Sequence, residues 1–155
     1  MNHIKTTLLG LAAAFALTAC GGNSSAPAGE AKGPISEQRT AAFKSMMPEF
    51  VSMGKMVKGE EAYEVEKFKQ AAAVFAENSK KPFQHFESDA QGNGDALPAI
   101  WQDQAKFKAE EEKFHAAVAK LNEAAQSGNL EAIKVAYGEA GASCKSCHDS
   151  FRKPK

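Results

Sequence analysis

The sequence predicts an all-α protein built as an antiparallel four-helix bundle, and three observations lead to this class. Four stretches carry apolar residues at alternating spacings of three and four, the pattern of helices that share a core. No stretch shows the two-residue alternation of a half-buried strand. The chain from Pro34 onward has about 120 residues, which is the usual size of one domain.

The first helix is expected from Ser36 to Val57, and the glycine that follows Lys58 supplies its C-terminal stop. Pro48 lies inside this helix and removes one backbone donor, so we expect a kink that shifts Phe43. The apolar face of the helix consists of Phe43, Met46 or Met47, Phe50, Met53 and Val57.

The second helix is expected from Tyr63 to Ser79 and the third from Ala99 to Gln126, with Asn129 as the N-cap of the fourth. Between the second and third helices, residues 80–99 lose the helical pattern and contain two prolines and two glycines. A connection of this length often has a functional role.

The fourth helix joins the fold to a chemical motif. Cys144, Cys147 and His148 form C-x-x-C-H, the signature of covalent c-type haem attachment, in which two thiols bind one porphyrin and the histidine ligates its iron. A zinc site would need a second pair of ligands at a matched spacing, and the sequence has none. We therefore predict one covalent haem c per chain, with both cysteines facing the core on the helix face Ile133, Tyr137, Ala140, Cys144, Cys147 and Phe151.

Residues 1–19 have the pattern of a signal peptide, with an apolar stretch too short to span a membrane. The end of this stretch matches a bacterial lipobox, in which Cys20 becomes the lipidated N-terminus; an ordinary signal peptide cleaved near Ala19 is the alternative. We expect residues 20–34 to be this N-terminus with a flexible linker, and residues 35–155 to be the domain. The predicted location is the periplasm, with the anchor in the outer membrane.

The charge pattern indicates no charged macromolecule as a partner. The chain has 19 Lys and Arg against 19 Asp and Glu and no basic run, so nucleic acid is not expected. Glu110, Glu111 and Glu112 are interleaved with lysines and are expected to form a solvated helix face, and His85 and His115 to be ordinary loop or surface residues. No phosphate-binding loop or catalytic triad is evident, so we do not expect an enzyme.

The chain resembles the cytochromes c′, the class II c-type cytochromes that carry the attachment motif near the C-terminus of a four-helix bundle. The resemblance covers about residues 36–153. Besides the haem motif it rests on three blocks, which are Arg39-x-x-x-Phe43, Met53-Gly54-Lys55-Met56-Val57-Lys58-Gly59-Glu60 and Pro98-Ala99-Ile100-Trp101.

This resemblance implies a five-coordinate, high-spin iron that binds nitric oxide and carbon monoxide, for nitric oxide tolerance or shuttling. Phe43 matches the apolar residue that covers the open side of the iron, and Arg39 matches the residue that pairs with a haem propionate. Arg152 matches the arginine beside the proximal face, next to the ligand His148. Phe83 and Phe86 match aromatic walls of the haem pocket, although relatives have tryptophan at the first of these positions.

A second function stays open, an electron-transfer cytochrome with His/Met-ligated iron. Met46 and Met47 lie near Phe43, and methionine occupies the Phe43 position in the low-spin relatives called cytochromes c-556. Core packing is nevertheless the better interpretation of both methionines, because methionine commonly fills gaps in cores. The resemblance also implies a homodimer through the first two helices, and the sequence indicates no redox partner.

Overall fold

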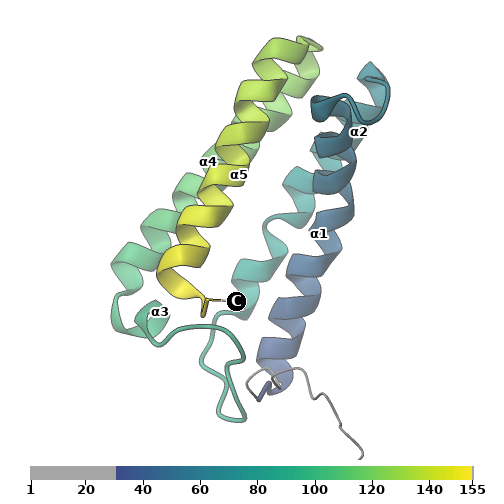
Figure 1. Cartoon of the computed structure of the whole chain (residues 1–155). Helices are drawn as coiled ribbons and strands as arrows, with labels where there is room; N and C mark the ends of the chain where they lie inside the picture. The colour runs from purple at the N-terminus through teal and green to yellow at the C-terminus, as the bar shows by residue number, and fades with distance from the viewer. Residues whose placement is uncertain (1–30, 155) are drawn as a thin grey trace, which may run out of the picture.

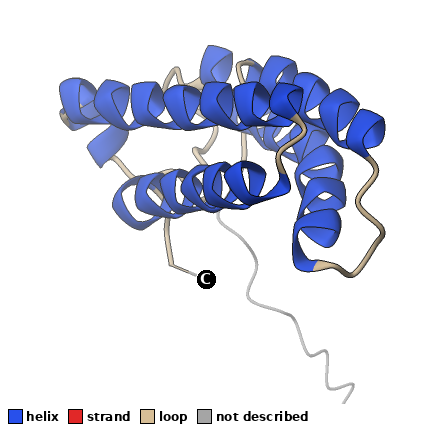
Figure 2. Cartoon of the chain, turned by 90° about the horizontal axis from the view of Figure 1, so that it is seen from above, coloured by secondary structure: helices blue, strands red, loops and turns tan. Residues whose placement is uncertain are grey.

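The structure, a computed structural model, describes residues 31–154, and its regular elements are helices joined by loops (Figures 1 and 2). Within that range it has α1 (Pro34–Lys58), α2 (Val65–Asn78), the 3-10 helix η1 (Lys81–His85), α3 (Ala99–Gln102), α4 (Gln104–Ser127) and α5 (Leu130–Phe151). The four long helices form the bundle, in which α1 packs mainly against α2 and α4 against α5. The predicted all-α four-helix bundle is confirmed.

Local signals placed most helix ends correctly. Gly59 ends α1 with φ 75°, a left-handed conformation that favours glycine. The side chain of Asn129 accepts hydrogen bonds from the backbone N–H groups of Glu131 and Ala132, so the predicted N-cap of α5 is confirmed. Helix α1 continues without a break through the exposed Pro48, and a bend there stays a prediction.

The predicted single helix from Ala99 to Gln126 is wrong, because the chain breaks between α3 and α4. Asp103 leaves the helical region, with φ −129° and ψ 70°, and its side chain accepts a hydrogen bond from the Lys106 N–H at 3.0 Å. An aspartate in this position starts a new helix, since it satisfies a backbone donor that the first turn leaves unpaired. The four-residue α3 is therefore a separate element that includes Trp101.

The core lies between the two helix pairs and is made of apolar side chains from all four long helices. Its most deeply buried large members, exposed by 1% or less, are Met53, Phe68, Phe75, Leu121 and Ile133. Helices α1 and α5 touch at few places. One of these is tight: the Tyr137 hydroxyl donates to the Phe50 carbonyl at 3.1 Å, and a Cβ on Gly54 would lie 2.3 Å from that hydroxyl oxygen. Gly54 therefore lets α1 approach α5.

Asp89, in the long loop 86–98, caps α1 from a distant part of the sequence. Its carboxylate, in a residue only 5% exposed, accepts hydrogen bonds from the N–H groups of Ser36 (2.9 Å) and Gln91 (3.1 Å). The N-cap residue Gly33 has no side chain for this purpose, and a Cβ there would lie 2.0 Å from the Asp89 Oδ1 atom. The hydrogen bond from Ser36 is the main reason that the pKa of Asp89 is lowered.

This bonding predicts a loss of stability in acid. A carboxyl whose pKa is lower in the folded state adds stability that is complete above its unfolded pKa, about 3.9, and is lost as pH falls through the folded pKa. The variant Asp89→Asn should therefore be less stable than the natural protein at pH 7, and the difference should shrink below about pH 3.9. Thermal unfolding across this pH range measures it.

The control is Glu87→Gln, which changes an exposed carboxylate in the same loop. This variant should follow the natural protein at every pH. A constant difference between Asp89→Asn and the natural protein from pH 7 down to about pH 2 would contradict the assignment, since a depressed pKa requires the difference to shrink in acid.

Among residues 31–154, no helix combines the length and apolar composition needed to cross a bilayer. The predicted signal peptide, the predicted lipidation site Cys20 and most of the predicted linker lie outside the described residues.

Candidate haem site

The last turns of α5 carry the C-x-x-C-H motif. Cys144 packs against the hydrophobic core and Cys147, three residues later, is also partly buried, whereas His148 is exposed. Neither of these two cysteines is in a disulfide. Burial raises the pKa of both thiols, to about 11 for Cys147, so each is protonated at neutral pH. The motif therefore presents two reduced thiols and an imidazole on one short stretch of helix.

Phe43 connects this motif to two further phenylalanines, Phe83 in η1 and Phe86 directly after it. Phe43 of α1 lies with its ring centroid 6.4 Å from that of His148, and 6.2 Å from each of those of Phe83 and Phe86. The structure thus brings together four predicted site residues that are up to 105 positions apart in the chain, from Phe43 to His148. Sequence reasoning missed Phe107 and Phe151 as a continuation of this wall: their centroids are 5.3 Å apart, and Phe107 lies 4.7 Å from Phe86.

Arg39 is 5% exposed, one helical turn before Phe43. Its guanidinium donates to the carbonyl of His85 at 2.9 Å and to that of Asn93 at 2.8 Å, and it lies over the Phe86 ring, 5.0 Å from the centroid. The Arg39 side chain is therefore buried and hydrogen-bonded within the protein, not a solvated surface charge. Two of its five donors hold η1 and the long loop against α1.

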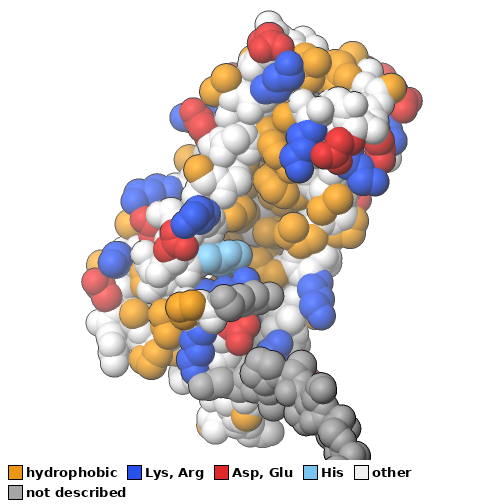
Figure 3. Space-filling view, viewed as in Figure 1, with side chains coloured by type: hydrophobic (Ala, Val, Ile, Leu, Met, Phe, Trp, Pro, Cys, Tyr) orange, Lys and Arg blue, Asp and Glu red, His pale blue; other side chains and the backbone are white. Residues whose placement is uncertain are grey.

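Arg152 follows α5 directly and faces the long loop. Its guanidinium pairs with the Asp95 carboxylate at 3.4 Å, and backbone bonds between Leu97 and Phe151 and between Lys153 and Asp95 fasten the same two segments together. A cavity of about 300 Å³ beside them is lined by His148, Asp149, Arg152, Lys153 and Pro154. The surface view shows a hollow between the helix pairs, with hydrophobic side chains along it and a histidine at its surface (Figure 3).

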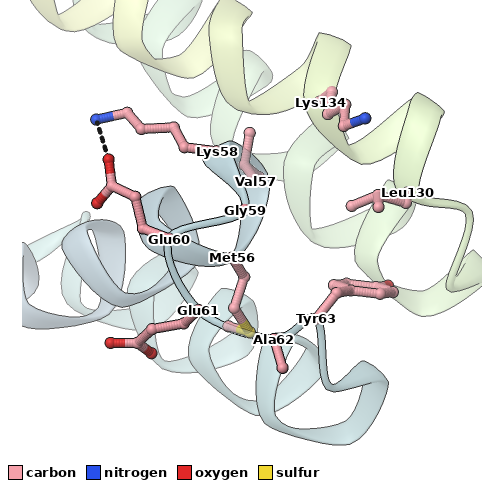
Figure 4. Close-up of a pocket in the computed structure, with 10 residues that line it drawn as sticks. All are labelled: Met56, Val57, Lys58, Gly59, Glu60, Glu61, Ala62, Tyr63, Leu130 and Lys134. Atoms are coloured by element: carbon pink, nitrogen blue, oxygen red, sulfur yellow. Dashed lines mark ion pairs between the residues drawn. The ribbon is translucent and has the colours of Figure 1, made fainter.

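A second cavity, about 450 Å³, lies at the other end of the bundle and takes no part in this site. It opens between the α1–α2 connection and the first turns of α5, where Lys58 and Glu60 pair with each other at 3.9 Å (Figure 4). Its lining mixes charged side chains with Met56, Tyr63 and Leu130, and it contains no cysteine or histidine.

The two methionines near Phe43 point to different environments. Met46 is 3% exposed and belongs to the hydrophobic core, whereas Met47 is 43% exposed on the outer side of α1. The preferred interpretation as core packing is therefore confirmed for Met46 and wrong for Met47. The α1 side chain whose ring faces His148 is that of Phe43.

Two residues predicted to be solvated are not. Glu110 is 7% exposed, and its Oε2 atom accepts a hydrogen bond from the Ser146 hydroxyl at 2.9 Å. The ring of His115 packs edge-on against Phe83, with centroids 4.9 Å apart, and its Nε2 atom is buried without a hydrogen-bond partner. The predicted solvated helix face is therefore wrong at Glu110, whose side chain reaches from α4 to the haem motif.

Comparison with known proteins identifies the family. A profile of the family described as Cytochrome C' matches residues 35–152. The chain belongs to the cytochrome c′ family. A cytochrome c′ of Alcaligenes xylosoxydans xylosoxydans is 38% identical over 117 residues, which are 76% of this chain and 91% of that protein.

Solved cytochromes c′ have the same fold. The nitric oxide complex of a mutant cytochrome c prime from Alcaligenes xylosoxidans matches with TM-score 0.74 and 36% identity, over 78% of this chain and 94% of that one. Cytochrome c′ from Rubrivivax gelatinosus matches with TM-score 0.72 and 35% identity, over 77% and 94%. The chain is therefore a haem protein of a family with covalently bound c-type haem, which is not an enzyme family.

The residues of the candidate site fit such a group. Covalent attachment needs two free thiols at this spacing and an adjacent imidazole, and the motif supplies all three. A porphyrin also needs apolar walls, and the ring of Phe43 lies beside that of His148 and contacts the rings of Phe83 and Phe86. Within residues 31–154 no group of three or more His, Cys, Asp or Glu side chains is arranged to hold a metal ion directly.

Proposed function

We propose that this cytochrome c′ binds nitric oxide and carbon monoxide at a five-coordinate haem held by Cys144, Cys147 and His148. The observation that carries the proposal is the pairing of Phe43 with His148, whose ring centroids are 6.4 Å apart. A phenyl ring cannot ligate iron, so α1 offers no ligand at the position that faces the histidine. When bound, haem supplies an iron whose free coordination position takes a diatomic gas.

Each residue of the proposed site then has a separate role in binding the haem or the gas. The two cysteines fix the cofactor covalently, His148 ligates from α5, and Phe43 excludes water and large ligands by its bulk. Arg39 holds the loop that carries Phe86 and keeps donors available for a propionate. Arg152, fixed by Asp95, sets the charge beside the cavity next to His148.

Nitric oxide tolerance or shuttling in the periplasm is the role that we propose for this site, with no catalytic turnover. The proposed lipid on Cys20 would hold the domain at the outer membrane through the linker. Replacing Cys20 by serine tests the anchor: the protein should move from the membrane fraction to the soluble periplasmic fraction.

A homodimer through α1 and α2 is supported by the exposed apolar residues Met47 and Val51 of α1 and Val74 of α2.

The deciding experiment is the optical and EPR spectrum of the purified holoprotein, ferric and ferrous, before and after adding each gas. High-spin iron that binds both gases is expected. A low-spin His/Met spectrum that carbon monoxide leaves unchanged would overturn the proposal and leave the electron-transfer function.

A further inference from the structure

Glu110 is a charged residue in an unusual place. It lies in α4, and its side chain is only 9% exposed, against 66% for that of its ion-pair partner Lys113. Carboxylates are seldom buried unless they are paired and hydrogen-bonded, because burial removes their hydration. The position of Glu110 therefore calls for a physical explanation in terms of what surrounds it.

Its two oxygens contact two different elements. The Oε1 atom accepts a hydrogen bond from the Lys113 ammonium, one turn later in α4, at 2.5 Å. The Oε2 atom accepts from the hydroxyl of Ser146, which stands between Cys144 and Cys147. The bond to Lys113, followed by the bond to Ser146, lowers the pKa of Glu110. The carboxylate is therefore ionised at neutral pH and sits directly against the attachment motif.

Two aromatic residues of the pocket wall lie close to Glu110 along α4. Phe107 and Phe114 lie about one turn before and after Glu110 in α4, and they contact Phe86 and Phe83 of the pocket wall at 4.7 Å and 5.8 Å between centroids. A charge beside low-dielectric material acts over a longer distance than one in water. The charge reaches the motif directly, because the Ser146 hydroxyl donates to the Glu110 Oε2 atom at 2.9 Å.

We propose that Glu110 tunes the haem: its buried negative charge beside Ser146 stabilises the ferric form and lowers the reduction potential. Reduction removes one positive charge from the iron, so a fixed anion nearby favours the oxidised state. Lys113 offsets this effect only in part, because its mostly exposed ammonium is screened by solvent. The inference rests on the proposed attachment of haem at Cys144 and Cys147, but not on which gas binds.

Potentiometric titration of three holoprotein variants tests it. Glu110→Gln keeps an acceptor for Ser146 but removes the charge, so the ferrous-to-ferric ratio at a fixed potential should rise about threefold to tenfold, where tenfold equals about 59 mV for one electron. Lys113→Gln removes the countercharge and should shift the potential downward by less. Glu112→Gln, an exposed residue of the same helix, should leave it unchanged.

Opposite signs for Glu110→Gln and Lys113→Gln would not arise from a purely structural role, because loosening the motif would shift both variants alike. An unchanged or lowered potential in Glu110→Gln overturns the proposal, as does an equal shift in Glu112→Gln. If Glu110→Gln does not fold, the sign of the Lys113→Gln shift decides, and no downward shift overturns the proposal. Carbon monoxide binding, recorded on the same samples, tests the proposed function separately.

Discussion

Phe43→Met is expected to convert the proposed five-coordinate iron into a six-coordinate, low-spin one. The ring of Phe43 faces His148 from α1, so a thioether in its place can supply the second axial ligand. Carbon monoxide then has to compete with methionine. If the thioether is bound in about 99% of molecules, the apparent affinity for the gas falls about a hundredfold. Optical spectra and carbon monoxide titration of the ferrous protein measure both effects.

Phe50→Met provides the matched control. Phe50 lies two turns further along α1, and its ring is stacked on that of Tyr137 with the centroids 4.4 Å apart. Among the described residues its ring contacts those of Tyr137 and Phe75, and not that of His148. This variant should keep the spectrum and the gas affinity of the natural protein. A Phe43→Met protein that stays high-spin and binds carbon monoxide with unchanged affinity would show that Phe43 does not cover the iron.

The parts of the structure that the sequence could predict are those with local causes. The three-four spacing of apolar residues, the glycine stop at Gly59 and the cap at Asn129 each act within a few residues. The same kind of signal was present at Asp103, whose side chain caps α4, but the apolar pattern around it hid the break. The haem motif is local too, because its chemistry fixes the spacing of Cys144, Cys147 and His148.

The features that could not be predicted depend on partners far away in the chain. Glu110 looks like part of a charged helix surface until α5 places Ser146 against it, 36 positions later. Asp89 caps α1 through Ser36, which is 53 positions earlier, and no periodicity links the two. Arg39 resembles a propionate partner, yet its strongest contacts are with backbone carbonyls of η1 and the loop. Single-sequence patterns do not contain such pairings, since they arise only when helices pack.

The double variant Cys144→Ala/Cys147→Ala is expected to lose covalent haem and much of the domain's stability. In the natural protein both thiols belong to α5 and the proposed site lies between α5 and α1, two helices that touch at few places. The thioether bonds keep haem on the unfolded chain as well, so the stability comes from its docking in the folded pocket: an effective concentration about a thousandfold above the dissociation constant of that docking adds about 4 kcal/mol. Losing it should lower the melting temperature by roughly 10–20 °C in a domain of this size.

Haem staining of a denaturing gel and thermal unfolding of the same preparations measure the two effects. Each single variant, Cys144→Ala or Cys147→Ala, keeps one thiol and should retain haem on the gel through one bond, with an intermediate melting temperature. Ser143→Ala, which removes a hydroxyl that donates to the Ala140 carbonyl of the same helix, should behave as the natural protein. Haem that stays on the gel in the double variant would mean that another residue attaches it. An unchanged melting temperature after haem loss would instead mean that the packing of α1–α2 against α4–α5 stabilises the bundle without the cofactor.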